Sequence, residues 1–179
     1  MKTIVFLADG FEECEALIVV DILRRAGIDT VMASVMKRLE VESSRRIKVL
    51  ADAMAEDVDL KSADLVFLPG GRLGTKNLEC SVIVQMTVRE YAEKKHVAAI
   101  CAAPRILAGL GLLNHKKATC HPDFESQMSG AILTGDSVSM DGNIITGQGL
   151  GAAFPLAFEL VKMFMGSEKV DEIKKDICY

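Results

Sequence analysis

Short apolar runs alternate with longer amphipathic segments along this chain. Five segments read as strands of a central sheet because they are short and rich in apolar or β-branched residues: 2–8, 29–35, 64–68, 97–100 and 143–146. Five longer segments have the spacing of helices: 12–26, 81–95, 105–110, 152–165 and 167–176. This alternation predicts an α/β sandwich with a mostly parallel sheet, formed by one domain over residues 1–179.

Shorter features complete the predicted fold. The polar stretch over residues 36–50 is typical of a hairpin, and Asp141-Gly142 predicts a tight turn that adds a strand over 137–140. A short strand is predicted over 117–120 and a helical turn over 123–128. In parallel sheets of this class, ligands bind beyond the carboxyl ends of the strands. Residues 9–13, residues 69–71 and Cys101 follow three such ends, and we expect them to converge.

Cys101 is the strongest candidate for chemistry. It follows the apolar strand over 97–100 and precedes Pro104, which stands near the start of the next helix. A cysteine on such a sharp strand-to-helix turn is typical of an activated nucleophile, and the N–H groups and dipole of the helix favour its thiolate. The alternative is a structural cysteine, because free cysteines are common in protein cores.

Glu15 and His121 are the candidate acid–base groups. Glu15 shares a helix face with Ile18, Val19 and Ile22, so a poorly solvated carboxyl with a raised pKa is expected. The alternative is an ordinary carboxylate favoured by the helix dipole, as for Glu12 and Glu13. His121 precedes Pro122 at a strand end and could reach Cys101 as acid or base, or could simply cap the next turn.

Backbone N–H groups of Gly70, Gly71 and Ala102 are candidate oxyanion donors, although a Gly-Gly pair also suits a plain β-to-α turn. Arg25 and Arg45 are candidate anion-binding residues, or ordinary solvated surface residues. The glycines at 147, 149 and 151 lack the dinucleotide-binding spacing, and the five scattered cysteines lack zinc spacing. We therefore expect no nucleotide, metal or other cofactor.

Composition excludes two classes of partner. The formal net charge is −4, which predicts no nucleic-acid binding, and no apolar run is long enough to span a membrane. Free thiols are expected, and with them a cytoplasmic location. The helix over 12–26 is apolar nearly all round, which predicts that the sheet covers one side. A second copy of the chain in a homodimer, or else a thick core within one chain, would cover the other.

Five motifs in this order resemble the ThiJ/PfpI superfamily, specifically its DJ-one branch: residues 8–15, 21–27, 66–71, 99–104 and 119–122. The resemblance implies a flavodoxin-like three-layer sandwich, related to class I glutamine amidotransferases, and a homodimer. It implies that Cys101 is the reactive cysteine, Glu15 a protonated partner of its sulfur, and His121 a nearby histidine. Gly71 and Ala102 would be the oxyanion donors, Arg45 would lie near the pocket, and Arg25 near the dimer interface.

The family resemblance suggests three functions. Relatives are similar to glutathione-independent glyoxalases and to deglycases that act on methylglyoxal adducts, which implies a small aldehyde or glycated substrate here. Others are described as redox-sensitive chaperones, which implies oxidation of Cys101 to sulfinic acid. A cysteine peptidase is disfavoured because Ala102 replaces the histidine that follows the cysteine in the peptidase branch. A non-catalytic binding dimer is a further alternative.

The chain also departs from the family pattern at the predicted pocket. Leu150 lies in a segment where relatives have a proline and hydroxyl groups. Arg72 and Arg105 stand where uncharged or smaller residues are usual, which predicts a more basic pocket mouth that favours acidic or phosphorylated ligands.

Overall fold

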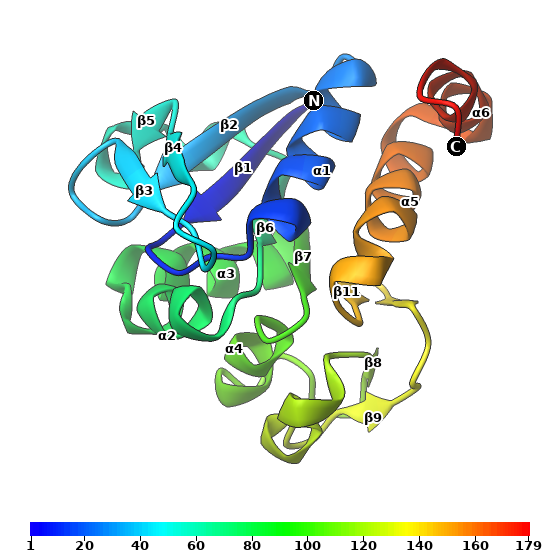
Figure 1. Cartoon of the computed structure of the whole chain (residues 1–179). Coiled ribbons are helices and arrows are strands. Elements are labelled where there is room, and N and C mark those ends of the chain that lie inside the picture. The colour runs from blue at the N-terminus through cyan, green and yellow to red at the C-terminus, as the bar shows by residue number, and fades with distance from the viewer.

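A seven-stranded sheet runs through the centre of the computed structural model, which describes residues 1–179 (Figure 1). In order across the sheet, its strands are β10 (Val138–Asp141), β11 (Ile144–Gly147), β7 (His96–Ile100), β6 (Leu65–Leu68), β1 (Lys2–Leu7), β2 (Asp29–Ser34) and β5 (Ala53–Met54). Every neighbouring pair is parallel except β10 and β11, which form the predicted hairpin. The order β2-β1-β6-β7-β11 is that of flavodoxin-like proteins, so the predicted fold class is confirmed.

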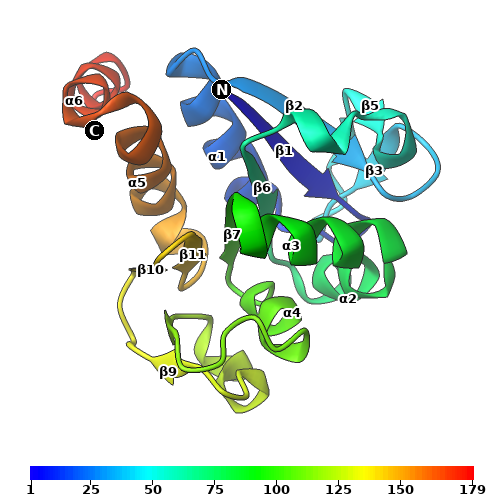
Figure 2. The same ribbon diagram turned by 180° about the vertical axis from the view of Figure 1, so that it is seen from behind.

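Helices cover both faces of the sheet and make it the middle of three layers (Figures 1 and 2). One face carries α1 (Glu13–Arg25), α5 (Ala153–Met165) and α6 (Ser167–Asp176), and the other carries α2 (Arg72–Cys80), α3 (Val82–Lys94) and α4 (Pro104–Gly109). Successive residues of β1 point to opposite faces. Val5 and Leu7 therefore join the core beneath α1 and α5, whereas Ile4 and Phe6 join the core beneath α3 and α4.

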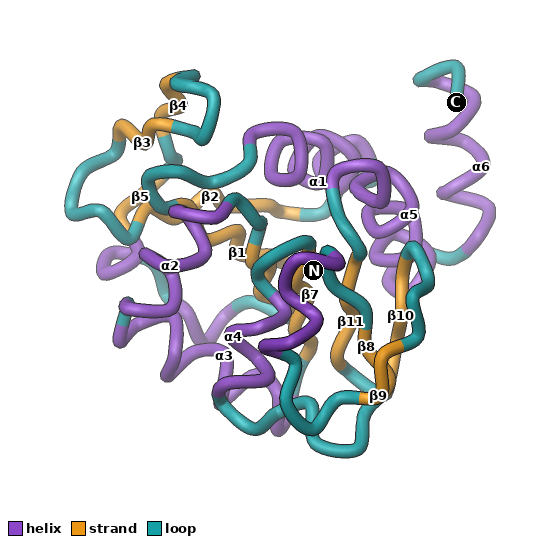
Figure 3. The backbone as a smooth tube through the Cα atoms, turned by 60° about the horizontal axis from the view of Figure 1, so that its bottom comes forward, coloured by secondary structure: helices purple, strands orange, loops and turns teal.

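Small elements decorate the ends of the sheet. β3 (Glu40–Glu42) and β4 (Lys48–Leu50) form the predicted hairpin, which projects from the body in Figure 3. β8 (Lys117–Ala118) pairs with β9 (Ile132–Leu133) in a separate two-stranded sheet, so the strand predicted over 117–120 is shorter and lies outside the central sheet. Four 3₁₀ helices complete the chain: η1 (Ala55–Asp57), η2 (Leu60–Ser62), η3 (Pro122–Gln127) and η4 (Leu150–Ala152). None of the helices has the length and apolar composition needed to cross a membrane.

Helix α1 begins and ends where the sequence predicts. The Glu12 carboxylate accepts a hydrogen bond from the Glu15 N–H at 2.7 Å, and Gly27 leaves the helix with a φ of 79°. The sheet covers one side of α1 and α5 packs along another, so a thick single-chain core accounts for much of its apolar character. Leu17 and Ile18 stay half-buried on the remaining face. The homodimer stays a prediction.

Helix α2 is the element that the hydrophobic pattern does not predict. Its first residue follows Gly71, which has no side chain to cap the helix, and Gly74 interrupts its first turns. A β-carbon at Gly74 would lie 2.5 Å from the Phe11 backbone, so glycine is needed for this close approach. Tertiary contact therefore specifies α2 where local propensity does not.

Candidate active site

The candidate site lies where the strand order reverses, beyond the carboxyl ends of β1, β6 and β7. The loop after β1 and the loop after β6 are joined by hydrogen bonds from Glu12 N–H to Gly70 C=O and from Gly74 N–H to Gly10 C=O, both 3.0 Å. The three segments predicted to converge therefore do so. Together with the β3–β4 hairpin they line a pocket of about 720 Å³.

Cys101 occupies the turn between β7 and α4 in a strained backbone conformation. Its φ is 64°, in the left-handed region that non-glycine residues seldom adopt. The turn is held because the Cys101 N–H donates to Gly147 C=O and the Cys101 C=O accepts from the His121 N–H, both at 2.9 Å. The half-buried side chain lines the pocket, as the sequence predicts for a residue at such an elbow.

Glu15 lies against Cys101 at the start of α1. Its carboxyl group is 1% exposed, hydrogen-bonds to the Cys101 thiol, and accepts the Gly70 N–H at 3.0 Å. Burial raises the pKa of Glu15 to about 7, and the Glu12 charge adds to this effect, whereas the Cys101 and Gly70 hydrogen bonds oppose it. The predicted poorly solvated carboxyl is therefore found, and it carries a proton through part of the neutral range.

The electrostatics of Cys101 differ from the sequence-based expectation. Burial, the Glu15 charge and the Glu15 hydrogen bond raise the pKa of Cys101 to about 12, although N–H groups of Gly71 and Ala102 lower it. The helix start therefore does not by itself produce a free thiolate. An ionised Glu15 keeps the proton on sulfur, so the pair holds one proton above about pH 7, and Glu15 carries a second one at lower pH.

The three candidate oxyanion donors have two different roles in the structure. The N–H groups of Gly71 and Ala102 are directed at the Cys101 sulfur, and their role as oxyanion donors stays a prediction. The Gly70 N–H instead donates to the Glu15 carboxyl group, so its assignment as an oxyanion donor is wrong. Gly70 must also be glycine, because a β-carbon there would lie 2.4 Å from Glu15 Oε2 and 2.7 Å from the Cys101 β-carbon.

His121 lines the same pocket, and of its two predicted roles the structure shows the cap, whereas the acid–base role toward Cys101 stays a prediction. Its Nδ1 accepts the Asp123 N–H at 3.2 Å, so the ring caps η3. A neutral imidazole that accepts at Nδ1 carries its proton on Nε2. His121 is thus arranged as a donor at Nε2, and its contact with Cys101 runs through the backbone.

Four arginines line the pocket, and two of them form ion pairs whereas the other two do not. Arg38 pairs with Asp9 at 2.5 Å, and Arg72 pairs with Asp123 at 2.9 Å. Arg45 and Arg46 also line the pocket and have no carboxylate partner within 4.0 Å. The pocket is therefore lined by two guanidinium groups, those of Arg45 and Arg46, that form no ion pair.

Arg105 and Arg25, also singled out from the sequence, form ion pairs outside the pocket. Arg105 is outside the pocket lining and pairs with Glu79, so the expectation that Arg72 and Arg105 both make the mouth basic is wrong. Arg25 bridges Asp21 and Asp176 and thereby joins α1 to α6. Leu150 is half-exposed at the start of η4, outside the pocket lining.

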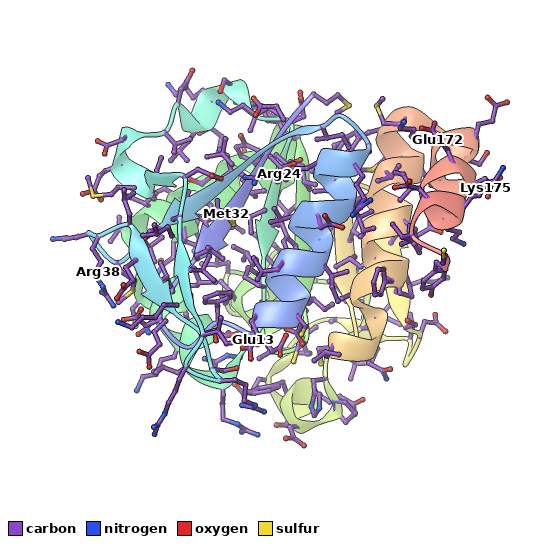
Figure 4. The ribbon with its side chains drawn as sticks, turned by 45° about the horizontal axis from the view of Figure 1, so that its top comes forward. Glu13, Arg24, Met32, Arg38, Glu172 and Lys175 are labelled. Atoms are coloured by element: carbon purple, nitrogen blue, oxygen red, sulfur yellow. The ribbon has the colours of Figure 1, made fainter.

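Sequence reasoning missed the role of Glu13. Its side chain is 6% exposed at the N-terminal end of α1 (Figure 4), where it accepts the Ser44 hydroxyl at 3.1 Å. Burial acts to raise the pKa of Glu13, but hydrogen bonds from its own N–H, from Ser43 and Ser44 and from the Arg45 N–H outweigh it, so the pKa is lowered. Glu13 therefore anchors the segment that carries Arg45 and Arg46. Ser43 and Ser44 lie about 30 residues from Glu13 in the sequence, so no pattern near Glu13 indicates this contact.

The fold and the site together define a class of protein: flavodoxin-like sandwiches with a strained cysteine at a strand-to-helix turn. In this class a buried glutamate contacts the sulfur, and backbone donors lie beside it. The model of the DJ-1/PfpI family matches residues 1–163, and the chain belongs to that family. The resemblance noted from its motifs is thereby confirmed.

Individual relatives agree with this assignment. The structure of oxidized DJ-1 from Toxoplasma gondii superposes with a TM-score of 0.95 at 31% identity, covering 99% of this chain and 98% of that one. Protein DJ-1 homolog B of Arabidopsis thaliana is 35% identical over 96% of this chain, which spans 40% of that protein's length. The glutathione-independent glyoxalase DJR-1.2 of Caenorhabditis elegans is 29% identical over 93% of this chain and 90% of its own length. The family therefore includes enzymes.

Proposed function

We propose that this protein is a cysteine-dependent enzyme that converts α-oxoaldehydes, or the adducts they form with amines and thiols, without glutathione. The single observation that carries the proposal is the Cys101–Glu15 pair, in which a buried carboxyl group with a pKa of about 7 hydrogen-bonds to a strained cysteine that lines a pocket. A carboxyl group that titrates near neutrality suits proton transfer in both directions. The naming of a Caenorhabditis elegans relative as a glutathione-independent glyoxalase supports the same reaction.

The proposed reaction begins with proton transfer from the Cys101 thiol to the Glu15 carboxylate. The sulfur then attacks the aldehyde carbon, and the carbonyl oxygen takes up the proton that Glu15 received from the thiol, which gives a hemithioacetal and returns Glu15 to its carboxylate form. Nε2–H of His121 is a candidate hydrogen-bond donor to that oxygen. The N–H groups of Gly71 and Ala102 stabilise negative charge beside the sulfur. Because these donors are fixed by the backbone, they require no reorganisation during the reaction.

Glu15 is then placed to carry the hydrogen that completes the conversion. Its carboxylate removes the proton from the former aldehyde carbon and returns it to the neighbouring carbonyl carbon, while the hydroxyl proton moves from the first oxygen to the second, which yields a thioester of the 2-hydroxy acid on Cys101. Water hydrolyses this thioester and regenerates the thiol. With methylglyoxal the balance is one water consumed and one lactate formed. In a glycated substrate, the amine or thiol leaves as the hydroxy acid is released.

The test is lactate formation from methylglyoxal without glutathione. Cys101→Ser and Glu15→Gln should each lose at least about 100-fold in turnover, because each removes one half of the proton-sharing pair. Cys178→Ser is the matched control, since Cys178 is an exposed cysteine near the C-terminus. Turnover retained in Cys101→Ser, or lost equally in Cys178→Ser, would refute the assignment.

A second candidate function is a redox sensor, and the same buried carboxyl favours it. Two equivalents of peroxide would oxidise the Cys101 thiol to sulfinic acid with release of two waters, and a protonated Glu15 could hydrogen-bond the product. The solved Toxoplasma gondii relative is an oxidized form. Intact mass and peptide mapping after mild peroxide should find two added oxygens on Cys101. A disulfide to Cys14 or Cys120 would instead count against this function.

We also propose that the protein is a homodimer through α1. Leu17 and Ile18 leave a half-buried apolar strip on its outer face, and Leu50 on the nearby hairpin is 69% exposed. Burying these side chains against a second copy would remove apolar surface from water. Light scattering after size exclusion should give a dimer mass for the wild type and a monomer mass for Ile18→Glu. A monomeric wild type would overturn this proposal.

A further inference from the structure

A cluster of three side chains lies next to the candidate site. Each of its members follows, within four residues along the chain, a residue of the site. Gly71 is followed by Arg72 at the start of α2, and the Cys101 turn leads to Arg105 in the first turn of α4. His121 leads to Phe124 in η3. We name the cluster of Arg72, Arg105 and Phe124 the Phe124 clamp.

Both guanidinium groups lie over the ring of Phe124. The Cζ atom of Arg72 is 5.2 Å from the ring centroid, and that of Arg105 is 5.9 Å from it. A guanidinium group within about 6 Å of an aromatic face is attracted by the ring quadrupole, and the attraction grows where water is excluded. Phe124 is only 7% exposed and the Arg105 side chain is 18% exposed, so these two members lie largely out of water, whereas the Arg72 side chain is 74% exposed and lies at the surface.

Ion pairs and hydrogen bonds fix both arginines around the ring. Arg72 pairs with Asp123 at 2.9 Å, next to Phe124 in the chain. Arg105 donates to Glu79 at 2.8 Å and to Gln127 at 2.7 Å, and its side chain is only 18% exposed. The clamp therefore joins α4 to η3 through the largely buried Arg105, and it joins α2 to η3 through Arg72, whose ion pair with Asp123 is exposed to solvent.

His121 is in contact with the same ring. The centroids of His121 and Phe124 are 6.3 Å apart in an edge-on arrangement, with an angle of 69° between the planes. Together with the hydrogen bond from the Asp123 N–H to Nδ1, this contact fixes the imidazole plane. Arg72 and Arg105, singled out as departures from the family pattern, thus both contact Phe124, and of the two only Arg72 also lines the pocket.

We propose that Phe124, in contact with Arg72 and Arg105, is a positioning residue that keeps the Gly71 N–H, the Cys101 turn and the His121 ring in their mutual arrangement. The inference rests on the proposed function for its catalytic consequence. Small displacements of reacting groups are costly, since a shift of about 1 Å can reduce rate about 100-fold. The contribution of Phe124 should therefore appear in kcat, whereas KM should change little.

The competing explanation is that Phe124 merely fills the core beside Met128. Two variants separate these roles. Phe124→Leu keeps an apolar side chain but removes the aromatic face, and Phe124→Tyr keeps the face. Arg72→Gln removes one guanidinium group, with Arg89→Gln as its control, because Arg89 is an exposed arginine on α3 whose guanidinium group reaches only the Leu110 C=O, at 3.4 Å.

The experiment measures kcat and KM for lactate formation together with the ¹⁵N NMR signals of the His121 ring. We expect kcat to fall about tenfold in Phe124→Leu, to fall less in Arg72→Gln, and to be restored in Phe124→Tyr. The His121 spectrum should show the Nε2–H form in the wild type and in Phe124→Tyr, and averaged tautomers in Phe124→Leu.

Two results would overturn the proposal. One is a Phe124→Leu protein with wild-type kcat and a wild-type His121 spectrum. The other is an equal loss in Phe124→Leu and Phe124→Tyr that follows the fall in Tm, which is the signature of a packing role alone. If the wild type shows no turnover, the proposed function fails and the His121 spectra still decide whether the clamp orders the ring.

Discussion

Glu15 and Cys101 meet at the base of the pocket, where the buried carboxyl group hydrogen-bonds to the thiol and the pKa of each is raised. The loop after β6 fixes this relationship, because the Gly70 N–H holds the carboxyl group from the other side. Because burial raises the pKa of both groups, the protonation of the pair changes with pH at values that differ from those of a glutamate or a cysteine in water.

The first prediction concerns stability against pH. Because the folded state raises the pKa of Glu15 from 4.5 to about 7, the native protein holds a proton that the unfolded chain releases. This stabilisation is complete below pH 4.5 and is lost as pH rises to about 7. Glutamine does not titrate, so Glu15→Gln does not lose this stabilisation. Its free energy of unfolding relative to wild type should therefore increase by roughly 3 kcal/mol between pH 4.5 and about pH 7. Urea unfolding across this range measures the difference. A difference that does not vary with pH would contradict the raised pKa.

The second prediction concerns the space at Gly70. A methyl group there would overlap both Glu15 Oε2 and the Cys101 β-carbon, so Gly70→Ala should lose about 1–3 kcal/mol of unfolding free energy together with turnover. Gly109→Ala is the matched control, because the added methyl at the end of α4 meets open space and should be neutral or stabilising. Equal stability of the two variants would show that the close contact at Gly70 relaxes without cost.

The sequence predicts the framework better than the site. The apolar strands and the turn at Cys101 carry local signals, and the structure has them within a residue or two of the expected bounds. Helix α2 carries little local signal, since Gly74 is demanded by the Phe11 backbone. The raised pKa of Cys101 could not be inferred from a helix start, because it depends on the burial and charge of a residue on another helix.

The same limit applies to charged side chains. Arg72 and Arg45 look alike in the sequence, yet Asp123 engages the first and no carboxylate engages the second. An ion pair between distant residues has no periodicity, so no pattern along the chain distinguishes a committed arginine from a free one. Only the packing of η3 against α2 makes that distinction here.

The third prediction concerns the anchor of the hairpin. Glu13 has a lowered pKa because hydrogen bonds from the 43–45 segment outweigh its burial, so its ionised form stabilises the fold above pH 4.5. Glu13→Gln should cost about 2 kcal/mol at neutral pH, and the difference should shrink as pH falls below 4.5, through the folded pKa. Hydrogen exchange should also become faster over residues 43–46. Glu56→Gln, at an exposed position in η1, is the control, and an equal effect there would refute the anchor role.

The fourth prediction concerns the two unpaired arginines. Iodoacetate and iodoacetamide are similar in size but differ in charge, so the ratio of their reaction rates at Cys101 reports the local potential. Arg45 and Arg46 line the same pocket as Cys101, and replacing both by Gln should lower the iodoacetate-to-iodoacetamide ratio by roughly threefold at low salt. High salt should remove most of the difference. Cys178 in the same sample is the internal control, because it is exposed and its ratio should not change. An unchanged ratio at Cys101 would mean that these arginines do not act on anions at the sulfur, and a parallel change at Cys178 would mean that the effect is only one of net charge.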